Sequence, residues 1–319
     1  MLEINGLTRS YGEHQAIRDV SLTVADGELV TIVGPSGCGK STLMRCIAGL
    51  LTPTSGQVVL NGAAVTSVPD RLGVVFQDYS RSLYPWLSVT DNVALPLVRR
   101  ERSRAARRKA ALAAIESVGL AGFEGRYPWQ LSGGMQQRVA IARALAYDPV
   151  LLLMDEPFGS VDAQTREDLE DLVLRVRAER NITILLVTHD IDESVYTGDR
   201  VIVLTPGPGR VRAEVTVGLS APRDQITTKE LREFAHLRAE VSRLVRGARQ
   251  SDPLALPRTH SHNGEAQLPS SATGLSSAAG TRLDAHVAAH HQNRRVTRRR
   301  VGPGGRCAAK LSGYGIPAV

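Results

Sequence analysis

The sequence predicts an α/β fold in which a mainly parallel sheet is covered by helices on both faces. Its apolar runs have the length of single strands, and helical stretches separate most of them. Runs that are apolar on both faces are typical of parallel strands buried between helical layers. The runs expected to form strands are residues 2–4, 20–24, 29–33, 73–76, 150–154, 182–187 and 201–204.

The chain has 319 residues, of which 42% are apolar, and can hold one large domain or two small ones. Its first residues do not show a positively charged segment followed by an apolar one, so we expect a cytosolic protein. No apolar run approaches the roughly 18 to 20 residues that cross a bilayer. Cys38, Cys46 and Cys307 show neither metal-ligand spacing nor a disulfide framework and are expected to be reduced thiols.

Positive charge is concentrated after residue 250. Residues 251–319 contain nine Lys or Arg and three Asp or Glu, a net charge of +6, which leaves +1 for residues 1–250. This distribution weakens the argument for a nucleic-acid-binding body. The segment 251–319 lacks periodicity, so we expect a disordered basic tail without a catalytic role. Its composition also fits a shifted reading frame in GC-rich DNA, which would make it a sequence artefact.

A glycine-rich loop joins the strand 29–33 to the helical stretch 41–50. Glycines let backbone N–H groups surround a phosphate, and the following helix contributes its positive end. Lys40 is expected to reach the β- and γ-phosphates and Ser41 to ligate Mg²⁺. By itself the loop indicates a nucleotide triphosphate. The residues that match the pattern G-x-x-x-x-G-K-[ST] are Gly34, Pro35, Ser36, Gly37, Cys38, Gly39, Lys40 and Ser41.

Two carboxylates, Asp155 and Glu156, end the apolar strand 150–154. Ligands bind at the carboxyl edge of parallel sheets, so these side chains are expected at the nucleotide. Asp155 suits the binding of Mg²⁺, and Glu156 suits the role of general base toward the attacking water. Without the glycine-rich loop, Asp155 and Glu156 would be interpreted only as the polar end of a strand.

A third motif lies shortly before these carboxylates. The segment Leu131-Ser132-Gly133-Gly134-Met135-Gln136-Gln137-Arg138 opens a helix expected to run to about Tyr147. Ser132, Gly133 and Gly134 lie where the free N–H groups of a helix face an anion, although a serine cap after a loop is the plainer interpretation. Together with the other two motifs, this segment resembles the signature motif of ABC ATPases.

The resemblance implies roles for four further positions. Tyr11 resembles the aromatic residue that stacks on adenine in this family. Gln77 resembles the glutamine that contacts Mg²⁺ or the attacking water. His189 resembles the histidine that contacts the γ-phosphate. Residues 160–162 (Ser-Val-Asp) resemble the family's D-loop with Val161 in place of the usual leucine, a change expected to be mild.

The resemblance also implies an architecture and an assembly. The fold would be a P-loop NTPase of ABC type, with an antiparallel β subdomain beside the mainly parallel core and a helical subdomain over about 88–148. The ATPase domain would span 1–250. Two copies would pack head to tail, so that Gly34–Thr42 of one and Ser132–Gly134 of the other enclose ATP and Mg²⁺.

Within the family, a separate cassette without membrane helices resembles the ATP-hydrolysing subunit of a bacterial importer. Its implied partners are membrane permease subunits and, indirectly, an extracytoplasmic solute-binding protein, with the cassette peripheral on the cytoplasmic face of the membrane. The alternative is a soluble ABC ATPase that acts on nucleic acid. Only about fifty residues separate Gln77 from Ser132, too few for the long coiled coil of such proteins, so nucleic acid is the weaker interpretation.

Several segments resemble the nitrate, sulfonate and taurine importer group, and the solute itself cannot be read from the ATPase. The surface near Gln77 to Val93 would receive a helix of the permease, with Leu83–Leu87 as an apolar docking patch; Trp86 and Leu87 could instead belong to the core. The segments that carry the group resemblance are residues 134–138, 154–159, 162–166, 188–193, 208–210 and 231–234.

Overall fold

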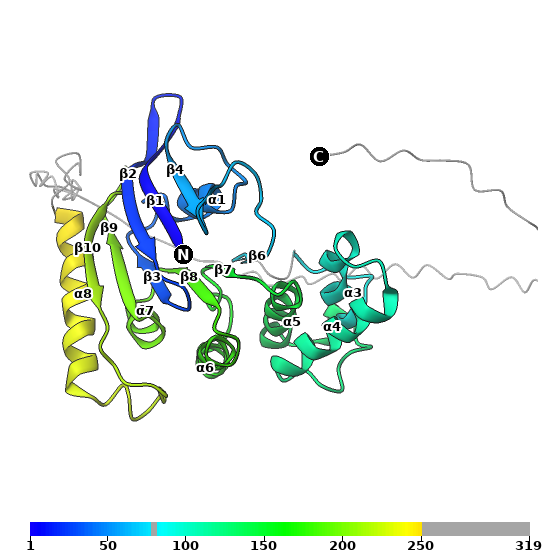
Figure 1. Ribbon diagram of the computed structural model, residues 1–319. Helices are drawn as coiled ribbons and strands as arrows, with labels where there is room; N and C mark the ends of the chain where they lie inside the picture. Colours follow the sequence, from blue (N-terminus) through cyan, green and yellow to red (C-terminus); the bar gives the residue numbers. More distant parts are fainter. Residues whose placement is uncertain (78–81, 251–319) are drawn as a thin grey trace, which may run out of the picture. The chain divides into compact units, whose positions relative to one another are not determined.

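A six-stranded mixed sheet forms the centre of the described chain (Figure 1). The computed structural model describes residues 1–77 and 82–250, except for the side chains of 248–250. The strand order is β10-β9-β3-β8-β7-β6, and only β10 runs antiparallel to its neighbour. The strands are β3 (Leu29–Val33), β6 (Leu72–Val75), β7 (Leu151–Asp155), β8 (Thr183–Thr188), β9 (Arg200–Leu204) and β10 (Val211–Thr216).

A second, antiparallel sheet has the order β2-β1-β4-β5. Its outer surface is polar: buried and exposed residues alternate along the second half of β2, as expected for a strand with one solvated face. The sequence pattern indicated only parts of β1 and β2 and did not indicate β4, β5 or β10. The strands are β1 (Leu2–Tyr11), β2 (His14–Val24), β4 (Ser55–Leu60) and β5 (Ala63–Ala64).

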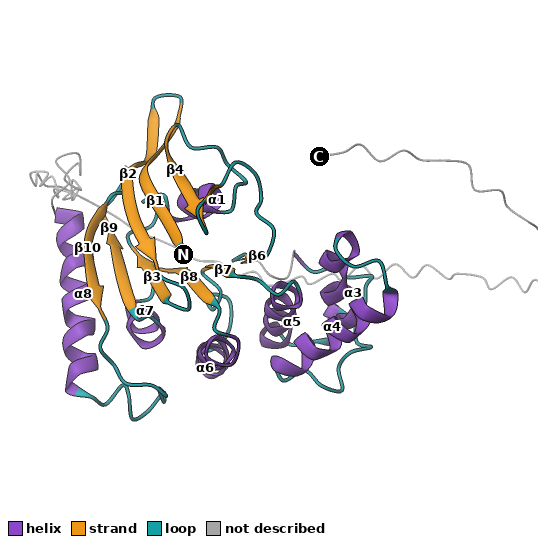
Figure 2. Cartoon of the chain, in the orientation of Figure 1, coloured by secondary structure: helices purple, strands orange, loops and turns teal. Residues whose placement is uncertain are grey.

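Helices cover both faces of the six-stranded sheet, with α1 and the antiparallel sheet on one side and α5 and α6 on the other (Figure 2). Helices α3, α4, α5, α6 and α7 each begin at a serine or aspartate whose side chain accepts a backbone N–H bond. The helices are α1 (Lys40–Ile47), α3 (Val89–Ala94), α4 (Arg104–Ser117), α5 (Gly133–Ala146), α6 (Ala163–Arg180), α7 (Ile191–Thr197) and α8 (Arg232–Gln250), with 3₁₀ turns η1 (Leu95–Arg99) and η2 (Pro128–Gln130).

Alternate residues of the central strands enter two different hydrophobic cores. On β7, Leu152 and Met154 pack with α5 and α6, whereas Leu151 and Leu153 pack with α1 and the antiparallel sheet. This double burial explains why the strand is apolar at every position rather than at every second one. Cys38 and Cys46 are buried free thiols, as expected; Cys307 and the predicted tail 251–319 lie outside the described residues.

The carboxyl ends of four parallel strands lie at one edge of the sheet. Val33 of β3 pairs with Thr188 of β8, and Val187 of β8 pairs with Asp155 of β7. Val75 of β6 pairs with Met154 of β7. The glycine-rich loop, the two carboxylates, the glutamine and the histidine therefore all follow strands that end at this edge. Among the described residues, no helix is both long and apolar enough to cross a membrane.

Candidate functional site

The glycine-rich loop leaves β3 and enters α1 in a conformation that depends on glycine. Gly39 has a φ of 92°, and a Cβ atom there would lie 2.5 Å from the carbonyl oxygen of Ala16. Both the left-handed backbone and this close approach exclude a larger residue. The loop is thereby held against β2, with the N–H groups that begin α1 at its end.

Lys40 lies inside this loop rather than on its surface. Its ammonium group donates to the carbonyl oxygens of Gly34, over 2.9 Å, and Pro35, over 3.2 Å. The side chain is almost fully buried, so the positive charge is held at the centre of the loop. This arrangement suits a triphosphate, whose oxygens are better partners for an ammonium than neutral carbonyls.

Ser41 and Asp155 provide the oxygen ligands that Mg²⁺ prefers. Their side chains are hydrogen-bonded to each other, at the start of α1 and the end of β7. Burial raises the pKa of Asp155, and the Ser41 hydroxyl and the charge of Lys40 act in the opposite direction. A hydroxyl and a carboxylate beside a phosphate-binding loop are a chemically suitable pair for Mg²⁺, which takes its other ligands from phosphates and water.

Glu156 is the point at which the candidate catalytic residues meet. Its Oε2 accepts a hydrogen bond from Nε2 of Gln77 over 2.8 Å and lies 3.3 Å from Nδ1 of His189. Glu156 has a φ of 47°, a left-handed conformation that is uncommon for a non-glycine residue and is often found at functional sites. The structure thus brings together three side chains that are 79 and 33 residues apart in sequence.

The signature segment begins α5. Ser132 is the N-cap, and its hydroxyl accepts from the N–H of Met135 over 3.3 Å. Gly134 is buried, and a Cβ atom there would lie 2.2 Å from Cγ2 of Thr165, so close packing of α5 against α6 by itself requires glycine. Within the described chain, no hydrogen bond, ion pair or ring contact joins residues 132–134 to the loop 34–42.

Tyr11 ends β1 at the tip of its hairpin with β2 and is exposed. The guanidinium of Arg9 lies 4.8 Å from the centre of the Tyr11 ring.

In the predicted D-loop, Asp162 caps α6 through the N–H of Thr165, and Val161 packs against the core formed with α5 and α6.

Sequence reasoning missed a polar cavity beside Glu156. It has a volume of about 60 Å³ and includes Glu193, a carboxyl group that is almost fully buried. Its neighbour Glu170, on α6, is buried as well. A glutamate within a helix normally predicts a solvated face, so nothing in the local sequence marked these two residues. The residues that line the cavity are Glu156, Gly159, Arg166, Thr188, His189, Asp190 and Glu193.

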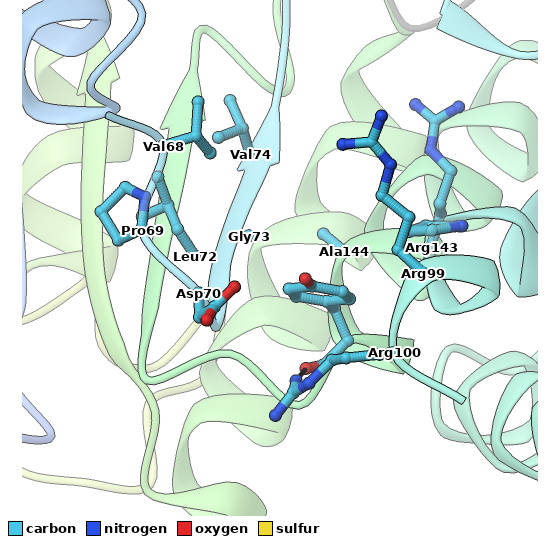
Figure 3. Close-up of a pocket in the computed structure, with 12 residues that line it drawn as sticks. Val68, Pro69, Asp70, Leu72, Gly73, Val74, Arg99, Arg100, Arg143 and Ala144 are labelled. Atoms are coloured by element: carbon cyan, nitrogen blue, oxygen red, sulfur yellow. Dashed lines mark hydrogen bonds between the residues drawn. The ribbon is translucent and has the colours of Figure 1, made fainter. Parts of the chain in front are cut away.

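A larger pocket, of about 600 Å³, lies elsewhere and contains none of the predicted catalytic residues. Figure 3 shows apolar side chains of β6 and the segment before it on one wall, and Arg99, Arg100 and Arg143 on the other. Arg143 donates to the backbone and hydroxyl oxygens of Ser82, which connects this pocket to the predicted docking segment.

The docking segment exposes its aromatic residues. Trp86 is 69% exposed and packs edge to face with Tyr84, with ring centroids 5.4 Å apart. Leu83 is buried and Leu87 partly buried. The alternative that Trp86 belongs to the core is therefore wrong, and the segment joins a buried anchor to an exposed aromatic pair.

Comparisons with known proteins place the chain in one family. The family model described as ABC transporter matches residues 17–159. The taurine import ATP-binding protein TauB of Yersinia pestis is 49% identical over 211 residues, which are 66% of this chain and 82% of that protein. The chain belongs to the ABC transporter family. It is therefore an ABC ATPase, and its mixed sheet with helices on both faces is the ABC type of P-loop fold.

Two further members of the ABC family cover most of the described residues. The aliphatic sulfonates import ATP-binding protein SsuB 2 of Burkholderia cenocepacia is 42% identical over 265 residues, which are 81% of this chain and 93% of that protein. The ATP-binding cassette MJ0796, solved as a dimer in a post-hydrolysis state bound to ADP and Pi, is 37% identical, with a TM-score of 0.61 over 68% of this chain and 99% of that chain. The predicted resemblance to the nitrate, sulfonate and taurine group is confirmed, and the comparisons favour transport over nucleic acid.

Proposed function

We propose that this ATPase drives a membrane importer for nitrate, a sulfonate, taurine or a similar small solute. The observation that carries the proposal is the identity of 42 to 49% with import ATP-binding proteins for taurine and sulfonates, over most of their length. The geometry at Glu156 supports it, since the base, the glutamine and the histidine needed for hydrolysis already contact one another.

In this proposal the residues of the glycine-rich loop bind ATP. Backbone N–H groups of the loop and the ammonium of Lys40 hold the β- and γ-phosphates, with Thr42 at the first turn of α1. The ring of Tyr11 stacks on the adenine. Ser41, Asp155 and Gln77 would hold Mg²⁺, which when bound neutralises charge that develops between the phosphates.

Glu156 accepts a proton from the water that attacks the γ-phosphate. Its partners orient it: the amide of Gln77 donates to one carboxylate oxygen, and His189 lies beside that same oxygen and can turn toward the γ-phosphate. The low exposure of Glu156 limits competition from bulk water. The side chains therefore hold the base in place before any substrate arrives.

Hydrolysis would take place between two copies of the chain. The signature residues Ser132, Gly133 and Gly134 begin α5, where free N–H groups and the helix dipole favour an anion, yet they make no bonded contact with their own loop 34–42. In a head-to-tail homodimer they would complete the phosphate site of the other copy. The dimeric state of the similar cassette MJ0796 supports this assembly.

The permease would dock on the exposed pair Tyr84 and Trp86 and the adjacent three-arginine pocket. This docking site is close in sequence to the proposed hydrolysis site, since the docking segment 83–87 begins shortly after Gln77. An extracytoplasmic solute-binding protein would deliver the solute to the permease, and the cassette would lie on the cytoplasmic face of the membrane. We also propose that 1–250 is the ATPase domain, with the helical subdomain about 88–148.

The experiment that tests this function is affinity purification of the tagged chain from gently solubilised native membranes. We expect a polytopic membrane protein in equal amount, and loss of that partner when Trp86 and Tyr84 are both replaced by serine. Recovery of soluble proteins alone, with ATPase activity stimulated by DNA or RNA, would instead support the nucleic-acid alternative.

A further inference from the structure

Two glutamates are buried side by side behind the hydrolysis site. Glu170 on α6 is 3% exposed, and Glu193 on α7 is 5% exposed. One oxygen of Glu170 accepts from the amide of Gln225 over 3.2 Å, and the carboxyl of Glu193 is hydrogen-bonded to the hydroxyl of Thr188. Oε1 of Glu193 is buried without a hydrogen-bond partner.

Ionisation of both Glu170 and Glu193 would destabilise the folded state. Each lies in a low-dielectric environment next to the other, and one oxygen has no donor to stabilise it. Burial raises the pKa of Glu170 to about 7, and burial followed by the charge of Glu170 raises the pKa of Glu193. A proton held by either carboxyl group removes one of the two charges and with it most of this cost.

Glu193 is connected to the segment that carries the histidine. The Thr188 hydroxyl, which is bonded to Glu193, also accepts the N–H of Asp190 over 2.9 Å. The carboxylate of Asp190 in turn accepts the N–H groups of Asp192 and Glu193. His189 lies between these two anchored residues, so its backbone position depends on Glu193.

The cavity provides a second connection. Glu193 lines it together with Glu156 and His189, and its volume of about 60 Å³ is large enough for at least one water molecule. Buried water bonds to otherwise unsatisfied polar atoms, and Oε1 of Glu193 is such an atom. A water there would link the unpaired oxygen to the hydrolysis site.

We propose that Glu193 is a positioning residue for His189, and that it acts in this way only while the buried pair Glu170 and Glu193 holds a proton. When that proton is lost, a second charge appears between α6 and α7, and the 188–190 segment moves from its position against Glu156. Turnover then falls while ATP binding remains. The proposal rests on the assignment of Glu156 and His189 to hydrolysis made above.

Other charged groups face the pair and adjust the pH at which the proton is lost. On α6, Arg166 favours the charged forms and also pairs with Asp190 over 3.7 Å. Asp190, before α7, disfavours the charged forms, and Lys229, which follows Gln225, favours the charged form of Glu170. Lys229 is itself 3.7 Å from the exposed Glu167, which limits its effect.

The test compares the pH profiles of kcat and KM for ATP in the full-length protein, from about pH 6 to pH 9. For the original chain we expect kcat to fall on the alkaline side with KM unchanged. Glu193→Ala should lower kcat at all pH values, by on the order of 10- to 100-fold. Glu193→Gln, which keeps an uncharged hydrogen-bonding group, should restore most of this loss and flatten the alkaline fall. Glu179→Gln, an exposed change of equal charge on the same helix, should follow the original profile.

Superimposable profiles for the original chain and Glu193→Gln would overturn the proposal, as would a loss in Glu193→Ala that appears in KM instead of kcat. If Glu193→Ala does not fold, infrared spectra of the original chain and Glu193→Gln at pH 7 test the proposal instead. The original chain should show the carbonyl stretch of a buried carboxylic acid, and this band must be weaker in Glu193→Gln. Failure of the proposed function is distinguishable, since His189→Ala and Glu156→Gln would then retain turnover whatever Glu193 does.

Discussion

The side-chain amide of Gln77 donates a hydrogen bond to Oε2 of Glu156 over 2.8 Å. The two residues follow neighbouring parallel strands, β6 and β7, whose ends are in register. This bond leaves the second carboxylate oxygen of Glu156 for the attacking water. A change on either side of the bond should therefore affect hydrolysis more than nucleotide binding.

Glu156→Gln should bind ATP and accumulate a closed dimer. An amide cannot accept the proton of the attacking water, so turnover should fall by on the order of 10²- to 10⁴-fold. Without hydrolysis, ATP continues to favour the state that binds it best. Phosphate release and size-exclusion chromatography with light scattering measure the two effects. Glu179→Gln, on the exposed face of α6, is the control; a monomeric Glu156→Gln under saturating MgATP would contradict the assembly.

Asp155→Asn should weaken the binding of Mg²⁺ in a measurable way. The amide keeps the shape of the side chain but loses the charge that favours the cation, so half-maximal turnover should need on the order of 10- to 100-fold more Mg²⁺. Removal of the metal by EDTA should stop turnover in the original chain. Asp148→Asn removes an exposed carboxylate paired with Arg71 and should change neither result.

Glu170→Gln should be more stable than the original chain at high pH, and this advantage should disappear at low pH. Because the pKa of Glu170 in the folded state is about 7, above the 4.5 of a solvent-exposed glutamate, the folded chain binds the proton more tightly than the unfolded chain. The free energy of unfolding of the original chain therefore decreases as pH rises between these two values and is level above them. Glutamine removes this decrease, a difference on the order of 3 kcal/mol at pH 8.

Thermal unfolding of both proteins between about pH 4.5 and pH 8 measures this effect. Glu179→Gln serves as the control, because it removes an equal charge from the exposed face of the same helix. A constant difference between Glu170→Gln and the original chain across the pH range would show that Glu170 is ionised in the folded state.

Trp129 should report formation of the closed dimer. It lies in η2, three residues before Ser132, and is 71% exposed. The chain has two tryptophans, so Trp86→Phe leaves Trp129 alone. In Trp86→Phe with Glu156→Gln, MgATP should shift the emission of Trp129 to shorter wavelength as the indole leaves water.

The converse variant, Trp129→Phe, leaves Trp86 as the single tryptophan. Its emission should respond to the permease and not to MgATP, since Trp86 belongs to the docking segment rather than to the cassette dimer. An unchanged Trp129 spectrum in a sample that light scattering shows to be dimeric would place Trp129 outside the interface.

A chain that ends at Gln250 should retain ATPase activity. All the proposed catalytic and nucleotide-binding residues lie before that position, and α8 ends there. We expect kcat and KM for ATP within about twofold of the full chain, a small difference for a change remote from the site. A folded truncated protein without activity would show that residues 251–319 take part in catalysis.

The site could be predicted largely from local sequence because each part of it follows a strand. Lys40, Asp155 and His189 each come directly after, or a few residues beyond, an apolar run, and parallel strands end at the same edge. The antiparallel strands β4 and β10 were not predicted, since their side chains are half exposed and lack a continuous apolar pattern. For the same reason the β subdomain could be expected only from the family resemblance.

The sequence by itself determined which strands are buried, where the phosphate-binding loop lies and which carboxylates stand beside it, because these features depend on neighbours in the chain. Only the tertiary structure decided that Gln77 and His189 meet on one oxygen of Glu156, that Trp86 faces solvent, and that Glu170 and Glu193 are buried together. These facts depend on how separate helices and strands pack, and a glutamate has the same local pattern whether its helix face meets water or another helix.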